Sequence, residues 1–341
     1  MRRFLALTTV AALALAGCRG TSPDDAAGAG AGDTIKIMVG GIDKVIYLPA
    51  KLTEQLGGFK AEGLDVQLLT EPSGATAENV LISGDVQGVV GFYDHTIDLQ
   101  TKGKCITSVV QFADVPGEVE IVPATSTITS PADFKGRKLG VTSSGSSTDF
   151  LTQYLATKGG LTSADYTTVK AGAGQTFIAA IDNGGIDAGM TTDPTAAKLV
   201  SSGKGRILLD MRTEAGARQA LGGLYPASSL YMDCAWVDSH QAQVQKLANA
   251  LVKTLRWIKG HSAEEIAAKM PAEFAAGDPA LYATAVHDSI GMFNGDGLMK
   301  EDGARNVLEV LSQFSPNVKG KKDQVDLSKT YTTAFTSKVA G

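Results

Sequence analysis

The fold is decided by the stretch Gly58-Phe59-Lys60-Ala61-Glu62-Gly63-Leu64-Asp65-Val66, which joins a helical segment to a strand. Glu62-Gly63 predicts a sharp turn with a positive φ at the glycine, because glycine has no Cβ to oppose that conformation. The run at 64–69 that follows is β-type and mostly apolar. This order predicts a helix that turns directly into a strand, as α/β proteins require.

The segments on either side continue this alternation. A β-type run covers residues 35–39, and leucines recur at helical spacing between residues 48 and 56. Residues 75–82 predict a second helix, and the apolar run at 87–92 predicts a third strand. Alternating strands and helices predict a parallel sheet with helices on its faces.

A second region repeats the pattern, and a helical region follows it. The predicted strands are 138–141, 166–169, 186–190 and 206–209, with helices at 150–155 and 175–182. Apolar, β-like runs follow at 228–232 and 234–237. Three later helices are predicted: one at 244–258, one that starts with the capping box at 262–265, and one at 307–314. We expect two doubly wound α/β lobes joined by a two-crossing hinge: residues 33–121 with 226–341, and residues 122–225. The crossings are expected near 118–125 and 223–229, with the C-terminal helices covering the first lobe.

The first residues predict export and lipid attachment. Arg2 and Arg3 precede an apolar run at 4–16, which is shorter than the ~20 residues needed to span a bilayer and is typical of a secretory signal. Leu15-Ala16-Gly17-Cys18 matches the lipobox of bacterial lipoproteins, which makes Cys18 the predicted lipid acceptor. We expect a signal peptide at 1–17, a flexible tether at 18–32, and a protein anchored on the periplasmic or extracellular face of a membrane.

Composition excludes several classes of function. The net charge of -5 argues against a nucleic-acid partner, which normally requires a basic face. The sequence contains no Gly-x-Ser-x-Gly, Walker loop or His-Glu-x-x-His, and its four histidines are scattered, so we expect no enzyme activity, cofactor or metal. Cys105 and Cys234 lie in apolar, strand-like stretches, which favours two small buried side chains, although an exported protein also permits a disulfide.

Four segments in order carry a family resemblance. They are residues 58–66, 81–86, 132–141 and 184–188, and Gln87 stands where the family usually keeps aspartate. On these segments nearly the whole mature chain resembles the nitrate, sulfonate, taurine and thiamine-pyrimidine periplasmic binding proteins of ABC importers, the SsuA/THI5-like family. The resemblance implies the type II periplasmic-binding-protein fold, a small-molecule ligand between the lobes, and an ABC permease with its ATPase as partners. We expect the protein to be a monomer.

Alternatives to an importer receptor remain open. A ligand sensor on the same fold would signal to a receptor, and the sequence does not separate this from transport. A thiamine-pyrimidine synthase relative shares the architecture, but it is cytosolic and carries a cysteine-rich iron site. The export signal and the two mature cysteines, Cys105 and Cys234, argue against an enzyme of that kind.

Candidate ligand-binding residues lie in loops after the predicted strands, where open α/β sheets bind ligands. Residues 144–148 open a helix whose N–H and hydroxyl groups suit a sulfonate, carboxylate, nitrate or similar polar head, and Ser73-Gly74 offers the same from the other lobe. The alternative is that both are ordinary helix caps. The full predicted set is Gly41, Tyr47, Ser73, Gly74, Tyr93, His95, Ser144, Gly145, Ser146, Ser147, Thr148, Thr192 and Asp193.

Three further expectations concern the ligand. Tyr93 and His95 are predicted to form an aromatic wall for its body, although His95 alone fits a hydrogen-bonded surface histidine equally well. Asp193 precedes a proline and fits a helix cap better than a ligand contact. The scarcity of cationic residues near these loops argues against an anion clamped by arginine, and a pyrimidine-type ligand stays open beside the anions.

Overall fold

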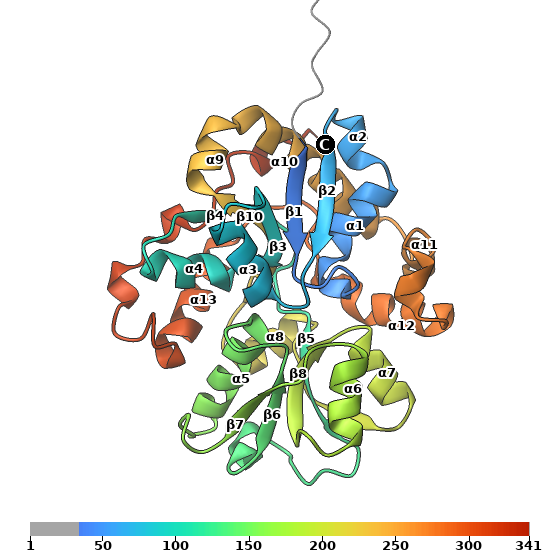
Figure 1. Cartoon of the computed structure of the whole chain (residues 1–341), viewed down its shortest axis with the longest axis vertical. Helices are drawn as coiled ribbons and strands as arrows, with labels where there is room; N and C mark the ends of the chain where they lie inside the picture. Colours follow the sequence, from blue (N-terminus) through green and yellow to red (C-terminus); the bar gives the residue numbers. More distant parts are fainter. Residues whose placement is uncertain (1–33, 341) are drawn as a thin grey trace, which may run out of the picture. The chain divides into compact units, whose positions relative to one another are not determined.

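The computed structural model describes residues 34–340, so the predicted signal peptide, Cys18 and the tether lie outside the described residues. Two five-stranded sheets organise this part of the chain (Figure 1). The first has the order β2-β1-β3-β10-β4, with β1 (Ile35–Val39), β2 (Val66–Thr70), β3 (Gly88–Phe92), β4 (Ile106–Gln111) and β10 (Ser228–Asp233). Strand β1 runs parallel to β2 and β3, whereas β10 is antiparallel to β3 and β4.

The second sheet repeats this arrangement. Its order is β7-β6-β8-β5-β9, with β5 (Glu118–Pro123), β6 (Lys138–Val141), β7 (Thr167–Lys170), β8 (Ala188–Thr192) and β9 (Gly205–Asp210). Strand β6 is parallel to β7 and β8, and β5 is antiparallel to β8 and β9. Each sheet with its packed helices is called a lobe below, and both belong to one compact unit.

Helices cover both sheets. Those of the first lobe are α1 (Leu48–Gln55), α2 (Gly58–Ala61), α3 (Gly74–Ile82), α4 (Asp94–Thr101), α9 (Cys234–Ser239) and α10 (Gln241–Lys259). Those of the second lobe are α5 (Ser147–Lys158), α6 (Gln175–Asp182), α7 (Thr195–Ser201) and α8 (Glu214–Leu221). The remaining helices are α11 (Ala263–Ala267), α12 (Pro279–Ser289) and α13 (Glu301–Phe314). None of the helices within 34–340 is long and apolar enough to cross a membrane.

Short 3-10 helices connect these elements. They are η1 (Val45–Tyr47), η2 (Pro131–Phe134), η3 (Ala272–Ala275), η4 (Ile290–Met292), η5 (Lys322–Gln324), η6 (Leu327–Lys329) and η7 (Thr336–Lys338). The turn predicted at Gly63 is present with φ 69°. The mixed α/β fold predicted from the alternation of strands and helices is therefore confirmed.

The C-terminal helices do more than cover the first lobe. Helix α10 packs on α1, α2 and β4, as expected, and buries Leu247, Leu251 and Leu255 there. Helix α13, however, packs on both α4 and α5, and α12 packs on both η1 and α7. Because each of these two helices contacts both lobes, they lie at the boundary between the lobes.

The two chain crossings between the lobes are hydrogen-bonded to each other. The backbone N–H of Phe112 donates to the carbonyl of Ser228 at 2.8 Å, and that of Ala227 donates to Ala113 at 3.0 Å. Strand β5 lies entirely in the second sheet, so the predicted boundary after residue 121 falls inside a strand and the first crossing ends before Glu118. The alternation Glu-Val-Glu-Ile-Val explains this, since it forms one continuous strand.

Two predictions for residues 105 and 234–237 were wrong. Cys105 and Cys234 form a disulfide, with an S–S distance of 2.05 Å and a Cα–Cα distance of 5.5 Å. The apolar run that begins at Cys234 is helix α9, not a strand, because the Asp233 side chain accepts hydrogen bonds from the N–H groups of Ala235 and Trp236. An aspartate in this position caps the first turn of a helix and so favours it over a strand.

Candidate functional site

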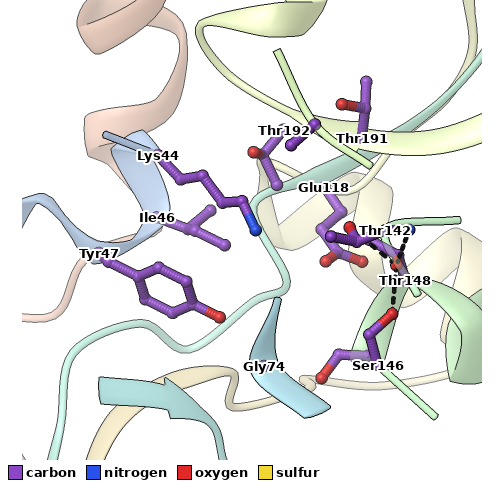
Figure 2. A pocket seen from close by; sticks show the side chains of 12 residues that line it. Lys44, Ile46, Tyr47, Gly74, Glu118, Thr142, Ser146, Thr148, Thr191 and Thr192 are labelled. Carbon is purple, nitrogen blue, oxygen red and sulfur yellow. Dashed lines mark hydrogen bonds between the residues drawn. The ribbon is translucent and has the colours of Figure 1, made fainter. Parts of the chain in front are cut away.

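The candidate site is a cavity of about 20 Å³ between the lobes, called the central cavity below. This volume is enough for little more than one water-sized group. The first lobe contributes Lys44, Ile46, Tyr47 and Gly74, and the second contributes Glu118, Thr142, Ser146, Ser147, Thr148, Ala173, Thr191 and Thr192 (Figure 2). Most of these residues follow the carboxyl ends of parallel strands, and Glu118, which starts the antiparallel β5, pairs with Thr192 at the end of β8.

Helices α3 and α5 begin on opposite sides of this cavity. Ser73 caps α3 by accepting from the N–H of Thr76, and the Ser143 hydroxyl donates to the Ser73 hydroxyl across the lobes at 2.9 Å. A second contact between the lobes joins the hydroxyl of Ser147, the first residue of α5, to Asp94 Oδ1 at 2.9 Å. The first N–H groups of both helices have no partner within their own helix, as at any helix start, so they are suited to hydrogen-bond acceptors on a ligand.

A chain of hydroxyl groups orients the second-lobe wall. The backbone N–H of Thr142 donates to Thr148 Oγ1 at 2.9 Å, and that hydroxyl donates to Thr142 Oγ1 at 3.1 Å. The Ser146 hydroxyl lies 2.7 Å from Thr148 Oγ1 and donates to the Ser143 carbonyl at 2.7 Å. Figure 2 draws the contacts among Thr142, Ser146 and Thr148 as dashed lines. These bonds fix the side chains in place before any ligand arrives.

Lys44 supplies a cation to the first-lobe wall. Its ammonium donates to the carbonyls of Gly40 at 2.7 Å and Pro72 at 3.1 Å, which leaves one of its three N–H donors for a ligand. Burial lowers the pKa of Lys44 to about 8, against the opposing effect of the Asp43 and Glu118 charges. Figure 2 shows the ammonium directed into the space between Tyr47 and Glu118.

Glu118 is the carboxyl group of the cavity. It is 2% exposed, and within residues 34–340 its Oε2 atom has no hydrogen-bond partner. Burial, and then the charge of Asp94, raise the pKa of Glu118 well above its usual range, while Lys44 opposes this shift. A raised pKa favours the neutral acid, which both donates and accepts hydrogen bonds.

A buried ion pair supports the start of α3. His95 Nδ1 lies 2.9 Å from the Glu78 carboxylate, and both side chains are buried. Burial alone would lower the pKa of His95, but the charge and hydrogen bond of Glu78, together with Asp94, raise it to about 9. A Cβ on Gly74 would lie 2.8 Å from His95 Nε2, so only glycine fits between this ring and the cavity.

Comparison with known proteins identifies the family. Residues 48–265 match the family model described as NMT1/THI5 like. The chain belongs to the NMT1/THI5-like family. The fold and family expected from the four sequence segments are thereby confirmed.

Two solved structures share the fold of this chain. A protein from Bordetella bronchiseptica RB50 is 35% identical with a TM-score of 0.85, and the match covers 89% of this chain and 96% of that one. The alkanesulfonate-binding protein SsuA from Xanthomonas axonopodis pv. citri, bound to MOPS, is 17% identical with a TM-score of 0.72 over 88% of this chain and 98% of its own. The second likeness shows the fold alone.

Two curated fungal relatives are named 4-amino-5-hydroxymethyl-2-methylpyrimidine phosphate synthase. That of Schizosaccharomyces pombe is 30% identical over 146 residues, which are 42% of this chain and 40% of the relative. That of Aspergillus parasiticus is 27% identical over 225 residues, which are 62% and 63% of the two chains. The chain therefore spans less than two thirds of the length of either relative.

In this NMT1/THI5-like protein, many of the predicted site residues lie at the cavity. Tyr47, Gly74, Ser146, Ser147, Thr148 and Thr192 line it, and Ser73, the residue before Gly74, accepts a hydrogen bond from Ser143 of the second lobe. Ser144 and Gly145 line a neighbouring hollow with Glu78 and Asp98. Gly41 lies under the Lys44 side chain with φ 115°, where a Cβ would be 2.5 Å from Lys44 Cε.

Three predicted residues lie elsewhere. The hydroxyl of Tyr93 lies 2.6 Å from Thr330 Oγ1, which positions it in the first lobe away from the cavity. His95 is fully buried and is neither a surface residue nor an aromatic wall. Asp193 caps α7 by accepting from the N–H of Ala197 at 3.0 Å, and its other oxygen binds Arg212 at 3.0 Å.

Six lining residues lie outside the predicted set: Lys44, Ile46, Glu118, Thr142, Ala173 and Thr191. Lys44 and Ile46 follow the first predicted strand and were within reach of the strand-end rule. Glu118 gave no such signal, because a glutamate alternating with valine in a strand is typical of a solvent-facing position. Among the lining residues that the structure describes, Lys44 is the single cation and none is an arginine, so the expectation of few cations near the site still stands.

No group of three or more histidine, cysteine, aspartate or glutamate side chains within residues 34–340 is arranged to hold a metal ion.

Proposed function

We propose that the protein is the extracytoplasmic solute-binding receptor of an ABC importer and that it holds one small solute between the walls of the central cavity, which stand further apart when the solute is bound. The observation that carries this proposal is that the cavity walls come from both lobes. A solute that contacts both walls stabilises the closed arrangement of the lobes relative to an open one. The closed arrangement is then the form that a permease recognises.

The chemistry of the walls supports a small solute with an acceptor-rich head. Lys44 offers one N–H donor, and the starts of α3 and α5 offer backbone N–H groups. These donors suit a sulfonate, carboxylate, nitrate or pyrimidine-type acceptor. Glu118, as a neutral acid, adds a group that donates to an acceptor or accepts from an N–H of the solute.

The proposal includes attachment through a lipid on Cys18 and a location outside the cytoplasm. The disulfide between Cys105 and Cys234 supports this location, because such bonds persist in oxidising compartments.

A thermal-shift screen of the purified protein tests the proposal. The probes are taurine, acetate, nitrate and a 4-aminopyrimidine, followed by calorimetry with any probe that raises the Tm. At a concentration of about a hundredfold its Kd, a bound solute adds ~2.7 kcal/mol to the free energy of unfolding. Native mass spectrometry checks in parallel for a solute that co-purifies with the protein.

Matched lysine variants make the screen specific. Lys44→Met is expected to lose the shift, whereas Lys51→Met, which alters a surface lysine paired with Glu54, is expected to keep it. Failure of every probe class, with no co-purified solute, would contradict the proposal.

Enzyme activity is the second candidate, favoured by the names of the two fungal relatives. The thiamine-pyrimidine synthase relative carries a cysteine-rich iron site. In this protein Cys105 and Cys234 are bonded to each other, so neither has a free thiol to bind iron. Incubating the protein with each solute that binds and analysing the mixture by mass spectrometry separates the two functions. A receptor returns the solute unchanged, and a new product would favour the enzyme.

A further inference from the structure

The second-lobe wall of the central cavity presents hydrogen-bond acceptors. Ser146 lines this wall, and its hydroxyl donates to the Ser143 carbonyl at 2.7 Å. Thr148 also lines the wall, and its hydroxyl donates to Thr142 Oγ1 at 3.1 Å. A hydroxyl group has a single hydrogen, so one that is already bonded within the protein leaves only lone pairs for a solute. These two side chains therefore accept hydrogen bonds from a solute and do not donate to it.

The Ser147 hydroxyl is committed in the same way. Ser147 lines the cavity and donates to Asp94 Oδ1 at 2.9 Å, and the Tyr225 hydroxyl donates to Asp94 Oδ2 at 2.8 Å. Asp94 is fully buried, and the nearby His95 is paired with Glu78. A carboxyl group consequently lies next to this part of the wall, where it favours positive over negative charge in the cavity.

Glu118 adds an acidic side chain to the same wall. It lines the cavity at 2% exposure, and within residues 34–340 its Oε2 atom has no hydrogen-bond partner. Figure 2 shows the carboxyl group beside the space that the Lys44 ammonium enters from the first lobe. Oε2 is covered in the closed arrangement and becomes accessible when the walls separate around a solute. Buried polar groups are normally hydrogen-bonded, so we expect the missing partner to come from the solute.

A cationic N–H donor satisfies Glu118 better than an anion does. Burial and the Asp94 charge raise the pKa of Glu118 well above its usual range, so its ionised form is unfavourable without a further positive charge. An ammonium group supplies that charge together with N–H donors. A simple anion bound at Lys44 would instead add a second negative charge to the same small space.

The first-lobe wall has the opposite character. Lys44 keeps one N–H donor for a solute, and α3 begins at Gly74 with backbone N–H groups that have no partner within the helix. The start of α5 adds N–H groups of the same kind from the second lobe. A solute that satisfies all of these groups combines an acceptor-rich head with a positively charged donor.

We propose that Glu118 selects solutes that carry an ammonium group, so that the solute is a small zwitterion and not a simple anion. Its carboxylate or sulfonate lies at Lys44 and the start of α3, and its ammonium group donates to Glu118 and to the hydroxyl oxygens of the same wall. This inference rests on the proposed function, because it concerns the solute of the same cavity.

Two matched pairs of probes test the selection. They are β-alanine with propionate, and taurine with ethanesulfonate; within a pair the acid head and the carbon chain are the same, and only the first member has the ammonium group. Calorimetry on the full protein is expected to show the ammonium-bearing member of at least one pair binding at least about tenfold more tightly than its partner, the effect of one charge-assisted hydrogen bond.

The possible outcomes separate this inference from the proposed function. Equal binding within both pairs would overturn the selection by Glu118 and leave the receptor function in place. The same holds if neither pair binds while nitrate, acetate or a 4-aminopyrimidine does. Failure of every probe, with no co-purified solute, would contradict the receptor function, and this inference would fall with it.

A matched pair of glutamate variants assigns the selection to one residue. Glu118→Gln is nearly isosteric and removes the negative charge, so it is expected to weaken binding of the ammonium-bearing probe about tenfold and to change that of its partner less than about twofold. Glu120, two residues along β5, is fully buried and is not among the described residues that line the cavity, so Glu120→Gln is expected to keep the selection.

Unchanged selection in Glu118→Gln, or an equal loss in Glu120→Gln, would overturn the assignment. Thermal unfolding checks that both variants are folded. If Glu118→Gln does not fold, the comparison of matched probes on the wild-type protein still decides whether an ammonium group is selected.

Discussion

The hydroxyl of Ser143 donates a hydrogen bond of 2.9 Å to the hydroxyl of Ser73, and this bond crosses from one lobe to the other. Ser73 caps α3 and Ser143 follows β6, so the contact joins the two polar loops that the sequence predicted to face each other. It lies beside the central cavity and is one of several contacts that join the lobes, together with the hydrogen bond from Ser147 to Asp94.

Ser143→Ala is expected to weaken solute binding about fivefold, because a typical hydrogen bond contributes ~1 kcal/mol and this one exists only when the lobes are closed. Calorimetric Kd values for the solute found by screening measure this effect. Ser83→Ala is the control, since its hydroxyl bonds to Val80 and Asp85 within the first lobe. Similar losses in both variants would refute a role in closure.

Gly74→Ala is expected to remove solute binding and to lower the free energy of unfolding by ~1–3 kcal/mol. The added Cβ would lie 2.8 Å from His95 Nε2, and that ring is held by Glu78 and cannot retreat easily. Urea unfolding and solute titration measure the two effects. Gly291→Ala is the matched control, because a Cβ there meets no atom within 4 Å. If Gly74→Ala binds solute and unfolds in urea as the wild type does, helix α3 accommodates the added methyl group without loss of stability, and the prediction is wrong.

The ion pair of His95 and Glu78 predicts a stability change with pH. The pKa of His95 is about 9 in the folded protein and 6.5 in its reference state, so the folded state binds more protons between these values. The stabilisation is complete below pH 6.5 and is lost as the pH rises through 9, by about 3 kcal/mol in all.

Urea unfolding across this pH range measures that loss. His95→Gln is expected to flatten the profile, whereas the exposed His287→Gln is expected to reproduce the wild-type slope. A wild-type slope in His95→Gln would assign the pH dependence to other groups.

Replacing both Cys105 and Cys234 by serine is expected to lower the free energy of unfolding by ~2–5 kcal/mol, because the bond closes a loop with a sequence separation of 129. Solute binding is expected to persist. Cys105 precedes β4 and Cys234 follows the antiparallel β10, which places the bond at the sheet edge opposite the cavity. Urea unfolding and solute titration of the double variant check both statements, and lost binding with intact folding would contradict the second.

Much of the fold could be predicted from the sequence because local signals agree with burial. The helix at 74–82 has its cap at Ser73, and the strand at 35–39 is apolar and ended by glycines. The run at 234–237 could not be assigned correctly from hydrophobicity, since three or four apolar residues fit a strand or a helix equally well. Its capping residue, Asp233, was the decisive signal.

The site could be predicted only in part. Residues 146–148 and Gly74 follow the ends of parallel strands, and these strand ends meet at the central cavity. Glu118 reaches the cavity from an antiparallel strand that starts there, a placement that depends on how distant segments pair. Tyr93 and Asp193 follow strand ends too, but their polar groups are already bonded to Thr330 and Arg212.

The hydrogen bonds between the two crossings limit how the protein can come apart. Ala227 bonds to Ala113, and Tyr225 bonds to Asp114, so the crossings form a double-stranded strap. A protease cut in either crossing would sever one strand of that strap while the other continued to connect the lobes. Because the bond between Cys105 and Cys234 also joins the two pieces, the nicked molecule would run as fragments only on a reducing, denaturing gel, and it would elute as a single particle under native conditions.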